Sequence, residues 1–287
     1  MLREKEPLFF LLPGLIALLA IVIAPLVYSL FMTFHDYILI TQRPPVFNGI
    51  NNLIRMVQDE RFLNSVKVTT FFSLGALLLE LLLGLAITVL LTFETKVTPY
   101  IRTIFIMIVV TPYIVVGYIW KILLNAQYSP INYLLNITLG FPKNFEWISN
   151  TQMVIPSLIL VDAWQWTPFV VIVLLAGIYA VPLEPQEAAK IDGASYWQIL
   201  RHIIFPLIRP LVLVVLLIRF MDTIKLFDLI YILTRGGPGT ASETISFYTY
   251  IMGFKFFDIG YSSAMSWTTV IVVEIICTIF IRFMRRK

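Results

Sequence analysis

Glu187-Ala188-Ala189-Lys190-Ile191-Asp192-Gly193-Ala194 is the longest charged, amphipathic interruption between the strongly apolar segments of this chain, and it continues to Phe205-Pro206. Pro182 and Pro185 precede it; they suit the end of one helix and the first turn of another, because proline has no backbone N–H to donate. Gly193 allows the backbone to reverse direction. The stretch therefore predicts two short helices joined by a tight turn.

The second of these helices has its own start signal. Ser195 followed by Gln198 fits a capping box, in which each side chain bonds the backbone N–H at the other position. Tyr196 and Trp197 offer area for burial. Such a helix–turn–helix fits a docking element for a soluble partner, and it equally fits an ordinary loop that lies on lipid. Spacing alone does not separate the two.

The composition indicates a membrane protein. The chain is 59% hydrophobic and only 13% charged, with a mean hydropathy of +0.87. A soluble domain of this length could not hide so many apolar side chains, because its surface must be largely polar. The net charge of +4 is small and forms no stripe with interleaved aromatics, which argues against nucleic acid as a partner. The single cysteine, Cys277, cannot form an internal disulfide.

Apolar runs predict an all-α polytopic fold, because crossing ~30 Å of hydrocarbon takes about 20 residues. The run at 8–34 is too long for a cleaved signal peptide, and we interpret it as a retained first span. No soluble domain is inserted, so residues 1–287 are expected to form one transmembrane domain. The six expected spans are 8–34, 66–91, 101–124, 153–180, 207–233 and 262–283.

The distribution of Lys and Arg predicts cytoplasmic termini, because short inner loops carry an excess of these residues. With the N-terminus inside, the loop at 184–206 is also cytoplasmic. The outer segments hold fewer basic residues over a longer length. The inner segments would hold Arg3, Lys5, Lys96, Arg102, Lys190, Arg201, Arg209, Arg282, Arg285, Arg286 and Lys287.

The fifth span carries the densest set of charges, namely Arg219, Asp222, Lys225 and Asp228, together with Thr223. Charges inside a membrane are costly, so each needs a partner or a water-filled face. One interpretation is a chain of ion pairs at i,i+3 spacing that keeps the helix neutral. The other, which we favour, is that this face lines a hydrated substrate pathway.

The fourth span contains a second polar group, which includes Asp162, Gln165, Trp166 and Phe169. Pro168 removes a helix hydrogen bond and predicts a kink. Tryptophan at mid-membrane fits a surface on which sugar rings stack, and it also fits a tight helix contact. The candidate pathway residues of the two spans are Gln165, Trp166, Phe169, Arg219, Asp222 and Thr223.

Other features leave alternatives open or exclude functions. Glu80 and Glu274 are single acids in the second and sixth spans, and each could bond a neighbouring helix, pair with a fifth-span base or face another subunit. No Gly-x-x-x-x-Gly-Lys-Ser/Thr motif is present, so the chain is not expected to hydrolyse ATP. The two histidines and Cys277 do not suggest a metal site, and no nucleophile–base pair stands out.

Two motifs resemble a known family. Glu187-Ala188-Ala189, Gly193 and Ile203-Ile204-Phe205-Pro206 resemble the EAA loop of ABC importer permeases, with Phe205 at a position where the family has Leu. A second stretch, Leu233-Thr234-Arg235-Gly236-Gly237-Pro238 followed by Thr244, Tyr250 and Phe254, resembles the F-type (first) permease of maltose, trehalose and glycerol-phosphate importers. The likeness runs from about Phe9 to the C-terminus.

The resemblance implies a type I importer fold and a non-enzymatic transport subunit in the cell membrane. It implies a second permease, two ATPase subunits that hold ATP and Mg²⁺, an extracellular solute-binding protein and a sugar substrate, with no cofactor in this chain. The loop at 184–206 would couple the permease to the ATPase. The alternative is an ion-coupled secondary transporter that uses the fifth-span charges, although no inverted repeat is visible. The coupling residues would be Glu187, Ala188, Ala189, Asp192, Gly193 and Ala194.

Overall fold

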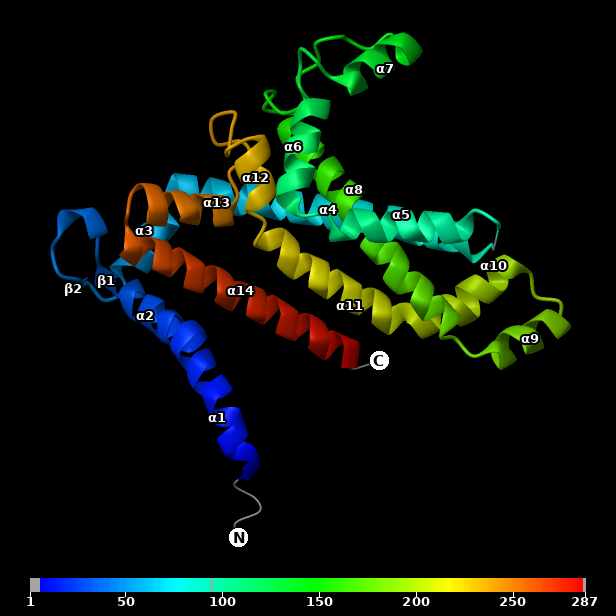
Figure 1. Cartoon of the computed structure of the whole chain (residues 1–287), viewed down its shortest axis with the longest axis horizontal. Helices are drawn as coiled ribbons and strands as arrows, with labels where there is room; N and C mark the ends of the chain where they lie inside the picture. Colours follow the sequence, from blue (N-terminus) through cyan, green and yellow to red (C-terminus); the bar gives the residue numbers. More distant parts are fainter. Residues whose placement is uncertain (1–5, 94, 286–287) are drawn as a thin grey trace. The chain divides into compact units, whose positions relative to one another are not determined.

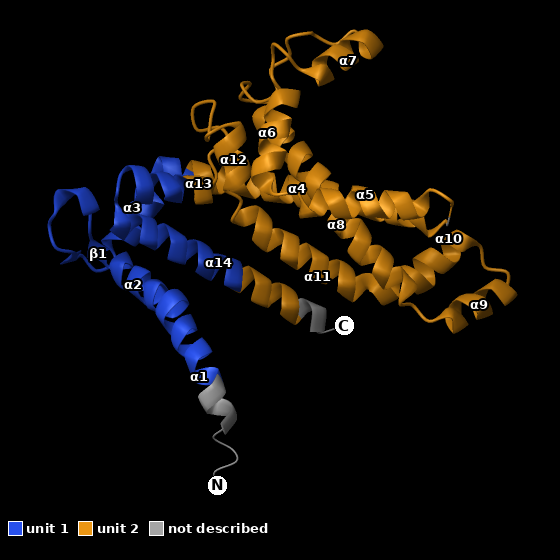
Figure 2. Cartoon of the chain, viewed as in Figure 1, with its two compact units in different colours: residues 1–63, 248–274 blue, residues 64–247, 275–287 orange. Residues whose placement is uncertain are grey.

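The computed structural model describes residues 6–93 and 95–285, and the chain forms two compact units (Figure 2). Unit 1 comprises residues 1–63 and 248–274, and unit 2 comprises residues 64–247 and 275–287. Figure 1 follows the elements along the chain. Four of the basic residues used to orient the termini, Arg3, Lys5, Arg286 and Lys287, lie outside the described residues.

Unit 1 contains the first apolar span and a small cap, formed by the short elements at 35–58 and by the part of the chain around 248–261 that packs on them. Val46 and Phe47 of β2 pair antiparallel with Asp36 and His35 of β1. Helix α4 begins in this unit, and α13 and α14 cross its boundary. Its elements are α1 (Glu6–Leu18), a π-helical turn (Leu19–Ile23), α2 (Ala24–Thr33), β1 (His35–Asp36), a 3-10 turn (Leu39–Thr41), β2 (Val46–Phe47), α3 (Asn51–Gln58), a second π-helical turn (Ile251–Lys255) and the start of α14 (Ile259–Arg285).

A carboxylate holds the cap of unit 1 together. Asp59 accepts hydrogen bonds from the hydroxyls of Tyr248, at 2.6 Å, and Tyr261, at 2.7 Å. Arg55 forms an ion pair with Asp258 at 2.8 Å and lies over the Tyr261 ring at 4.0 Å. Burial raises the pKa of Asp59, but the two tyrosine hydroxyls and backbone N–H groups outweigh it and hold that pKa below its ordinary value.

Unit 2 is helical throughout its named elements. Two glycines allow close helix packing, since a Cβ on Gly84 of α4 would lie 2.5 Å from Val170, and one on Gly177 of α8 would clash with Leu211. Its elements are α4 (Glu60–Thr92, from Asn64 onward), α5 (Thr98–Val110), α6 (Tyr113–Leu123), α7 (Pro130–Leu139), α8 (Val154–Tyr179), α9 (Leu183–Ile191), α10 (Tyr196–Ile199), a π-helical turn (Leu200–Ile204), α11 (Phe205–Ile224), α12 (Asp228–Leu233) and α13 (Ile245–Tyr250).

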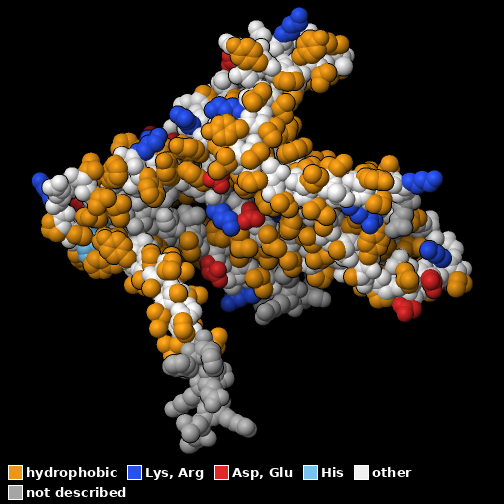
Figure 3. Space-filling model, in the orientation of Figure 1, with side chains coloured by type: hydrophobic (Ala, Val, Ile, Leu, Met, Phe, Trp, Pro, Cys, Tyr) orange, Lys and Arg blue, Asp and Glu red, His pale blue; other side chains and the backbone are white. Residues whose placement is uncertain are grey.

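The described residues contain five helices that are long and apolar enough to cross a membrane, and six spans if one bent pair is counted as a span. The five are Leu11–Thr33, Glu60–Thr92, Val154–Tyr179, Tyr196–Ile224 and Ile259–Arg282. The face visible in Figure 3 is dominated by hydrophobic side chains, as expected where lipid is the solvent. With the bent pair counted as one span, each of the six sequence-predicted spans overlaps one of these segments.

The third span is broken rather than straight. Helices α5 and α6 meet at an angle of 101° across Thr111 and Pro112. Proline disfavours the helical conformation of the residue before it, and Thr111 accordingly has an extended ψ of 125°. The carbonyl of Thr111 accepts a hydrogen bond of 2.9 Å from the Gln165 side chain. A buried amide thus satisfies a backbone group that the break leaves outside the helix ladder.

The fifth span ends earlier than the sequence predicted. Helix α11 stops at Ile224 and Lys225 caps it, so the residues to 233 form a separate short helix, α12. Lys225 and Asp228 are therefore not one turn apart on a single helix, as the i,i+3 ion pair requires. No ion pair joins these two side chains in the part of the chain that the structure describes, and that link of the predicted ion-pair chain is wrong.

Candidate functional site

The loop at 184–206, called here the coupling loop, has the predicted helix–turn–helix form. Helix α9 begins after Pro182, whose ψ of 143° is extended, and carries Glu184 in its first turn. At its end the N–H of Ala194 bonds the carbonyl of Ala189 at 2.9 Å, and the N–H of Gly193 bonds that of Lys190 at 3.1 Å. These two bonds form a Schellman motif, which satisfies the last carbonyls of the helix.

Gly193 makes this turn possible. Its φ of +80° lies in the left-handed region, which side chains with a Cβ rarely adopt. A Cβ at this position would meet nothing within 4 Å, so the space around Gly193 is open. Within this chain, glycine is therefore required for its backbone conformation and not for space. A Cβ at this position could clash only with a partner that docks on the loop.

The second helix starts with the predicted capping box. The Ser195 N–H donates to Oε1 of Gln198 at 2.6 Å, and the Gln198 N–H donates to Oγ of Ser195 at 3.4 Å. From Tyr196 the chain remains helical through the π-helical turn into α11 and on to Ile224. The loop is thus the direct extension of a membrane-spanning helix.

The coupling loop rests on the ends of other helices of unit 2. Ala189, Ala194 and Tyr196 pack against a buried cluster. The Tyr196 hydroxyl also forms a hydrogen bond with Thr92, the last residue of α4, and its ring packs on Phe93 with centroids 4.9 Å apart. The buried cluster consists of Val89, Ile178, Val181, Ile199, Leu200, Ile204 and Ile208.

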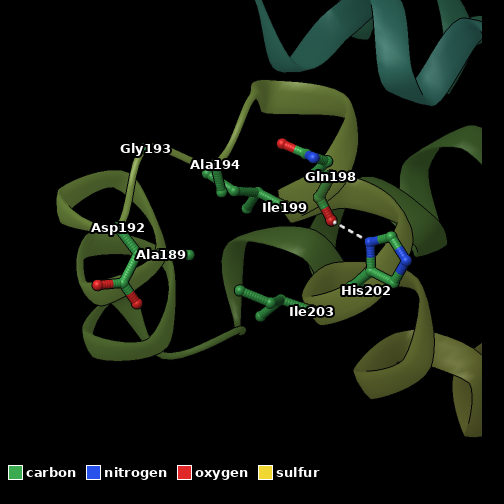
Figure 4. A pocket seen from close by; sticks show the side chains of 8 residues that line it. All are labelled: Ala189, Asp192, Gly193, Ala194, Gln198, Ile199, His202 and Ile203. Carbon is green, nitrogen blue, oxygen red and sulfur yellow. Dashed lines mark hydrogen bonds between the residues drawn. The ribbon is translucent and has the colours of Figure 1, made fainter.

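A hollow of about 350 Å³ opens between α9 and the α10 segment (Figure 4). Ala189 and Ala194 leave room in it because their side chains are small. On the far side from Asp192, Nδ1 of His202 lies 3.0 Å from the carbonyl of Gln198, as the dashed line shows. Its lining comprises Ala189, Asp192, Gly193, Ala194, Gln198, Ile199, His202 and Ile203.

The predicted coupling residues lie together in the second half of α9 and in the turn that follows it. Glu187, Ala188, Asp192 and Gly193 are exposed, whereas Ala189 and Ala194 are half-buried against the cluster below. Exposed apolar side chains flank them: Ile191 is 87% and Trp197 66% exposed. Charged and apolar groups thus lie side by side, which suits a protein partner.

Mid-span, unit 2 contains a buried charge cluster formed by Glu80, Asp162 and Arg219. The Arg219 guanidinium donates to both Glu80 oxygens, from Nε at 2.7 Å and from Nη2 at 2.8 Å, and Nη2 also donates to Asp162 at 2.7 Å. All three side chains are about 1% exposed or less. The cluster joins α4, α8 and α11, and it selects one of the roles that the sequence left open for Glu80.

Aromatic side chains cover this cluster. Arg219 lies over the Trp166 ring at 4.5 Å from its centroid, an arrangement that favours the cation. The Trp166 indole N–H donates to the Tyr113 hydroxyl, which in turn lies 3.5 Å from Asp162. Phe169 meets Trp166 edge-on at 5.9 Å. Sequence reasoning missed Tyr113, which the bend after Thr111 brings to this site.

The predicted pathway residues fall into two groups. Gln165, Arg219 and Thr223 are buried at 1% exposure. Trp166, Phe169 and Asp222 are half-buried, and the Asp222 side chain is 27% exposed. Asp222 lies 3.7 Å from Arg219 and pairs with the exposed Lys225 at 2.9 Å, as the i,i+3 pattern predicted. The described residues bring no three His, Cys, Asp or Glu side chains together as a metal site.

Unit 2 combines apolar spans with a buried polar cluster and a structured loop at the end of a span, which is typical of membrane transport proteins. The chain belongs to the family of binding-protein-dependent transport system inner membrane components, whose model matches residues 80–286. It is therefore a multi-pass permease of an ABC transporter. The family gives no support to the ion-coupled alternative.

Relatives and solved structures agree with this assignment. The chain is 32% identical to the trehalose/maltose transport system permease protein MalF of Thermococcus litoralis, over 94% of this chain and 90% of that protein. It is 31% identical to the trehalose transport system permease protein SugA of Mycobacterium tuberculosis, over 98% and 89%. A crystal structure of a bacterial ABC transporter that imports the acidic polysaccharide alginate has a chain of the same fold, with a TM-score of 0.86, 22% identity and coverage of 99% and 96%.

Proposed function

We propose that this chain is one permease subunit of an ATP-driven sugar importer, and that it forms half of the translocation pathway. The observation that carries the proposal is the coupling loop: an exposed helix–turn–helix, built on Gly193, that continues without interruption into a membrane-spanning helix. The names of MalF and SugA support a sugar as substrate. The family description supports dependence on a binding protein.

The assembly would contain a second permease, two ATPase subunits that hold ATP and Mg²⁺, and an extracellular solute-binding protein. A bacterial alginate ABC transporter with a chain of the same fold has been crystallised in complex with an alginate pentasaccharide-bound periplasmic protein. Both termini and the coupling loop would face the cytoplasm, as the basic residues predict. Glu187 and Asp192 would supply charged contacts to an ATPase, Ala188, Ala189 and Ala194 would permit close approach, and Gly193 would form the turn.

The sugar would pass the exposed edge of the mid-span site. Trp166 and Phe169 offer faces on which the C–H groups of a sugar ring can stack, and Asp222 can accept hydrogen bonds from hydroxyls. Gln165, Arg219 and Thr223 would support this edge from behind, since they are buried. The mid-span bases in the described part of unit 2, Arg219 and Lys225, are both paired with carboxylates. This pairing favours an uncharged saccharide over a sugar phosphate.

The test is purification from native membranes through a tag on this chain, followed by reconstitution into vesicles. We expect a second permease and an ATPase to co-purify, and labelled maltose or trehalose to enter the vesicles only with ATP and the binding protein. Uptake driven by an ion gradient without ATP would contradict the proposal.

A single substitution addresses the coupling loop. Gly193→Asp is expected to abolish uptake while the amount of protein in the membrane stays unchanged. A Cβ at this position meets open space within this chain, so a loss of uptake beyond that of the control reports on the docked partner. The left-handed backbone adds a cost of about 1–2 kcal/mol, which is too small to remove the protein from the membrane. Gly140→Asp is the matched control, because Gly140 also has a positive φ and open space. Normal uptake by the Gly193→Asp variant would contradict the coupling assignment.

A further inference from the structure

The charged groups of the buried cluster bond one another across three helices, which lining a pathway does not require. Arg219 donates from Nε and Nη2 to two carboxylates on two other helices, and all three donor–acceptor distances are 2.7 or 2.8 Å. Burying three charges is costly, and a well-packed apolar contact would hold helices together at least as well. A cluster of this kind provides directional, geometrically specific links between helices.

The helices joined by the cluster are those that carry the coupling loop. Helix α8 leads into α9, and the α10 segment continues into α11, so Asp162 and Arg219 lie on the two helices that flank the loop. Helix α4, which carries Glu80, meets the loop at its own end through the bond between Thr92 and Tyr196. All three helices are thus tied together twice, once at the loop and once at mid-span.

Close packing between the two ties leaves little freedom for sliding. Gly84 of α4 lies against Val170 of α8, and Gly177 of α8 lies against Leu211 of α11, each too close to admit a Cβ without movement of the neighbour. Close-packed contacts of this kind are bistable or rigid, and they do not deform continuously.

We propose that Arg219 is a positioning residue: by binding Glu80 and Asp162, it makes α4, α8 and α11 move as one body when the coupling loop is displaced. Without it, the contacts of Gly84 and Gly177 would still hold the loop-side halves of the helices, but the mid-span site beyond them could lag behind the loop, and ATP would be hydrolysed without sugar transport. This role rests on the proposed import function, and it requires no contact between Arg219 and the sugar.

The decisive variant, Arg219→Lys, keeps the charge and removes the fork. The shorter base would still neutralise one carboxylate, but a single ammonium group cannot reproduce the planar guanidinium that reaches Glu80 twice and Asp162 once. In the reconstituted complex with maltose or trehalose as probe, we expect sugar uptake per ATP hydrolysed to fall about tenfold, the factor that corresponds to one lost charge-assisted hydrogen bond. ATP hydrolysis itself should continue.

Arg209→Lys is the matched control, because Arg209 is exposed on the same helix, and its uptake per ATP should equal that of the unchanged protein. If Arg219→Lys fails to assemble, the triple variant Glu80→Gln, Asp162→Asn, Arg219→Met decides, since it removes every charge of the cluster together. A normal uptake per ATP in either variant would overturn the proposal. Failure of the import function itself would be distinguishable, because the unchanged protein would then show no ATP-driven uptake.

Discussion

At the scale of single residues, Gln165 shows how a break in one helix is compensated by another. Its side-chain amide donates to the Thr111 carbonyl, and Gln165 is 1% exposed. Gln165→Leu would leave that carbonyl without this donor, at a cost of about 1–3 kcal/mol. We expect a lower melting temperature of the purified complex. Gln152→Leu is the control, because Gln152 is exposed and its side chain makes no hydrogen bond in the described structure. An unchanged melting temperature for Gln165→Leu would contradict this role.

At the scale of elements, the capping box of α10 is the feature that can be tested most directly. Ser195→Ala removes the acceptor for the Gln198 N–H, and the loss of such a cap costs about 1 kcal/mol. Amide hydrogen exchange in α10 is therefore expected to become about fivefold faster in that variant, because local opening becomes easier. Ser195→Thr retains a capping hydroxyl and should exchange like the unchanged protein. Equal exchange rates in the alanine and threonine variants would show that the cap contributes nothing.

The elements also show which features the sequence could predict. The turn at Gly193 and the cap at Ser195 follow from neighbouring residues, so both were predictable, and the structure confirms both. The break at Pro112 had a local signal too, a proline within an apolar run, but hydropathy alone indicated a straight span. The pairing of Glu80 with Arg219 had no such signal, since the two residues are 139 positions apart and only the packing of three helices brings them together.

At the scale of the whole molecule, the balance of charge along the proposed pathway predicts what the permease accepts. Asp222 neutralises Lys225 at 2.9 Å, so Asp222→Asn would leave an exposed ammonium group at the edge of the mid-span site. An unpaired surface charge attracts an anion by about 1 kcal/mol, or roughly fivefold in affinity. We test this by measuring ligand binding to the purified complex without binding protein. In the Asp222→Asn variant, we expect the affinity for glucose 1-phosphate to rise roughly fivefold relative to the affinity for maltose.

The control for this charge change lies a short way further along the same chain segment. Asp228 is exposed and forms no ion pair in the described structure, so Asp228→Asn alters the net charge equally without releasing a base. If both variants shift the preference by the same amount, net charge alone is responsible, and the Asp222–Lys225 pair has no part in selection. If only Asp222→Asn shifts it, the pair lies close enough to the sugar to sense its charge. Specific ion pairs would then keep the pathway neutral. They would do so without making it apolar, and an apolar lining would offer no partner for the hydroxyls of a sugar.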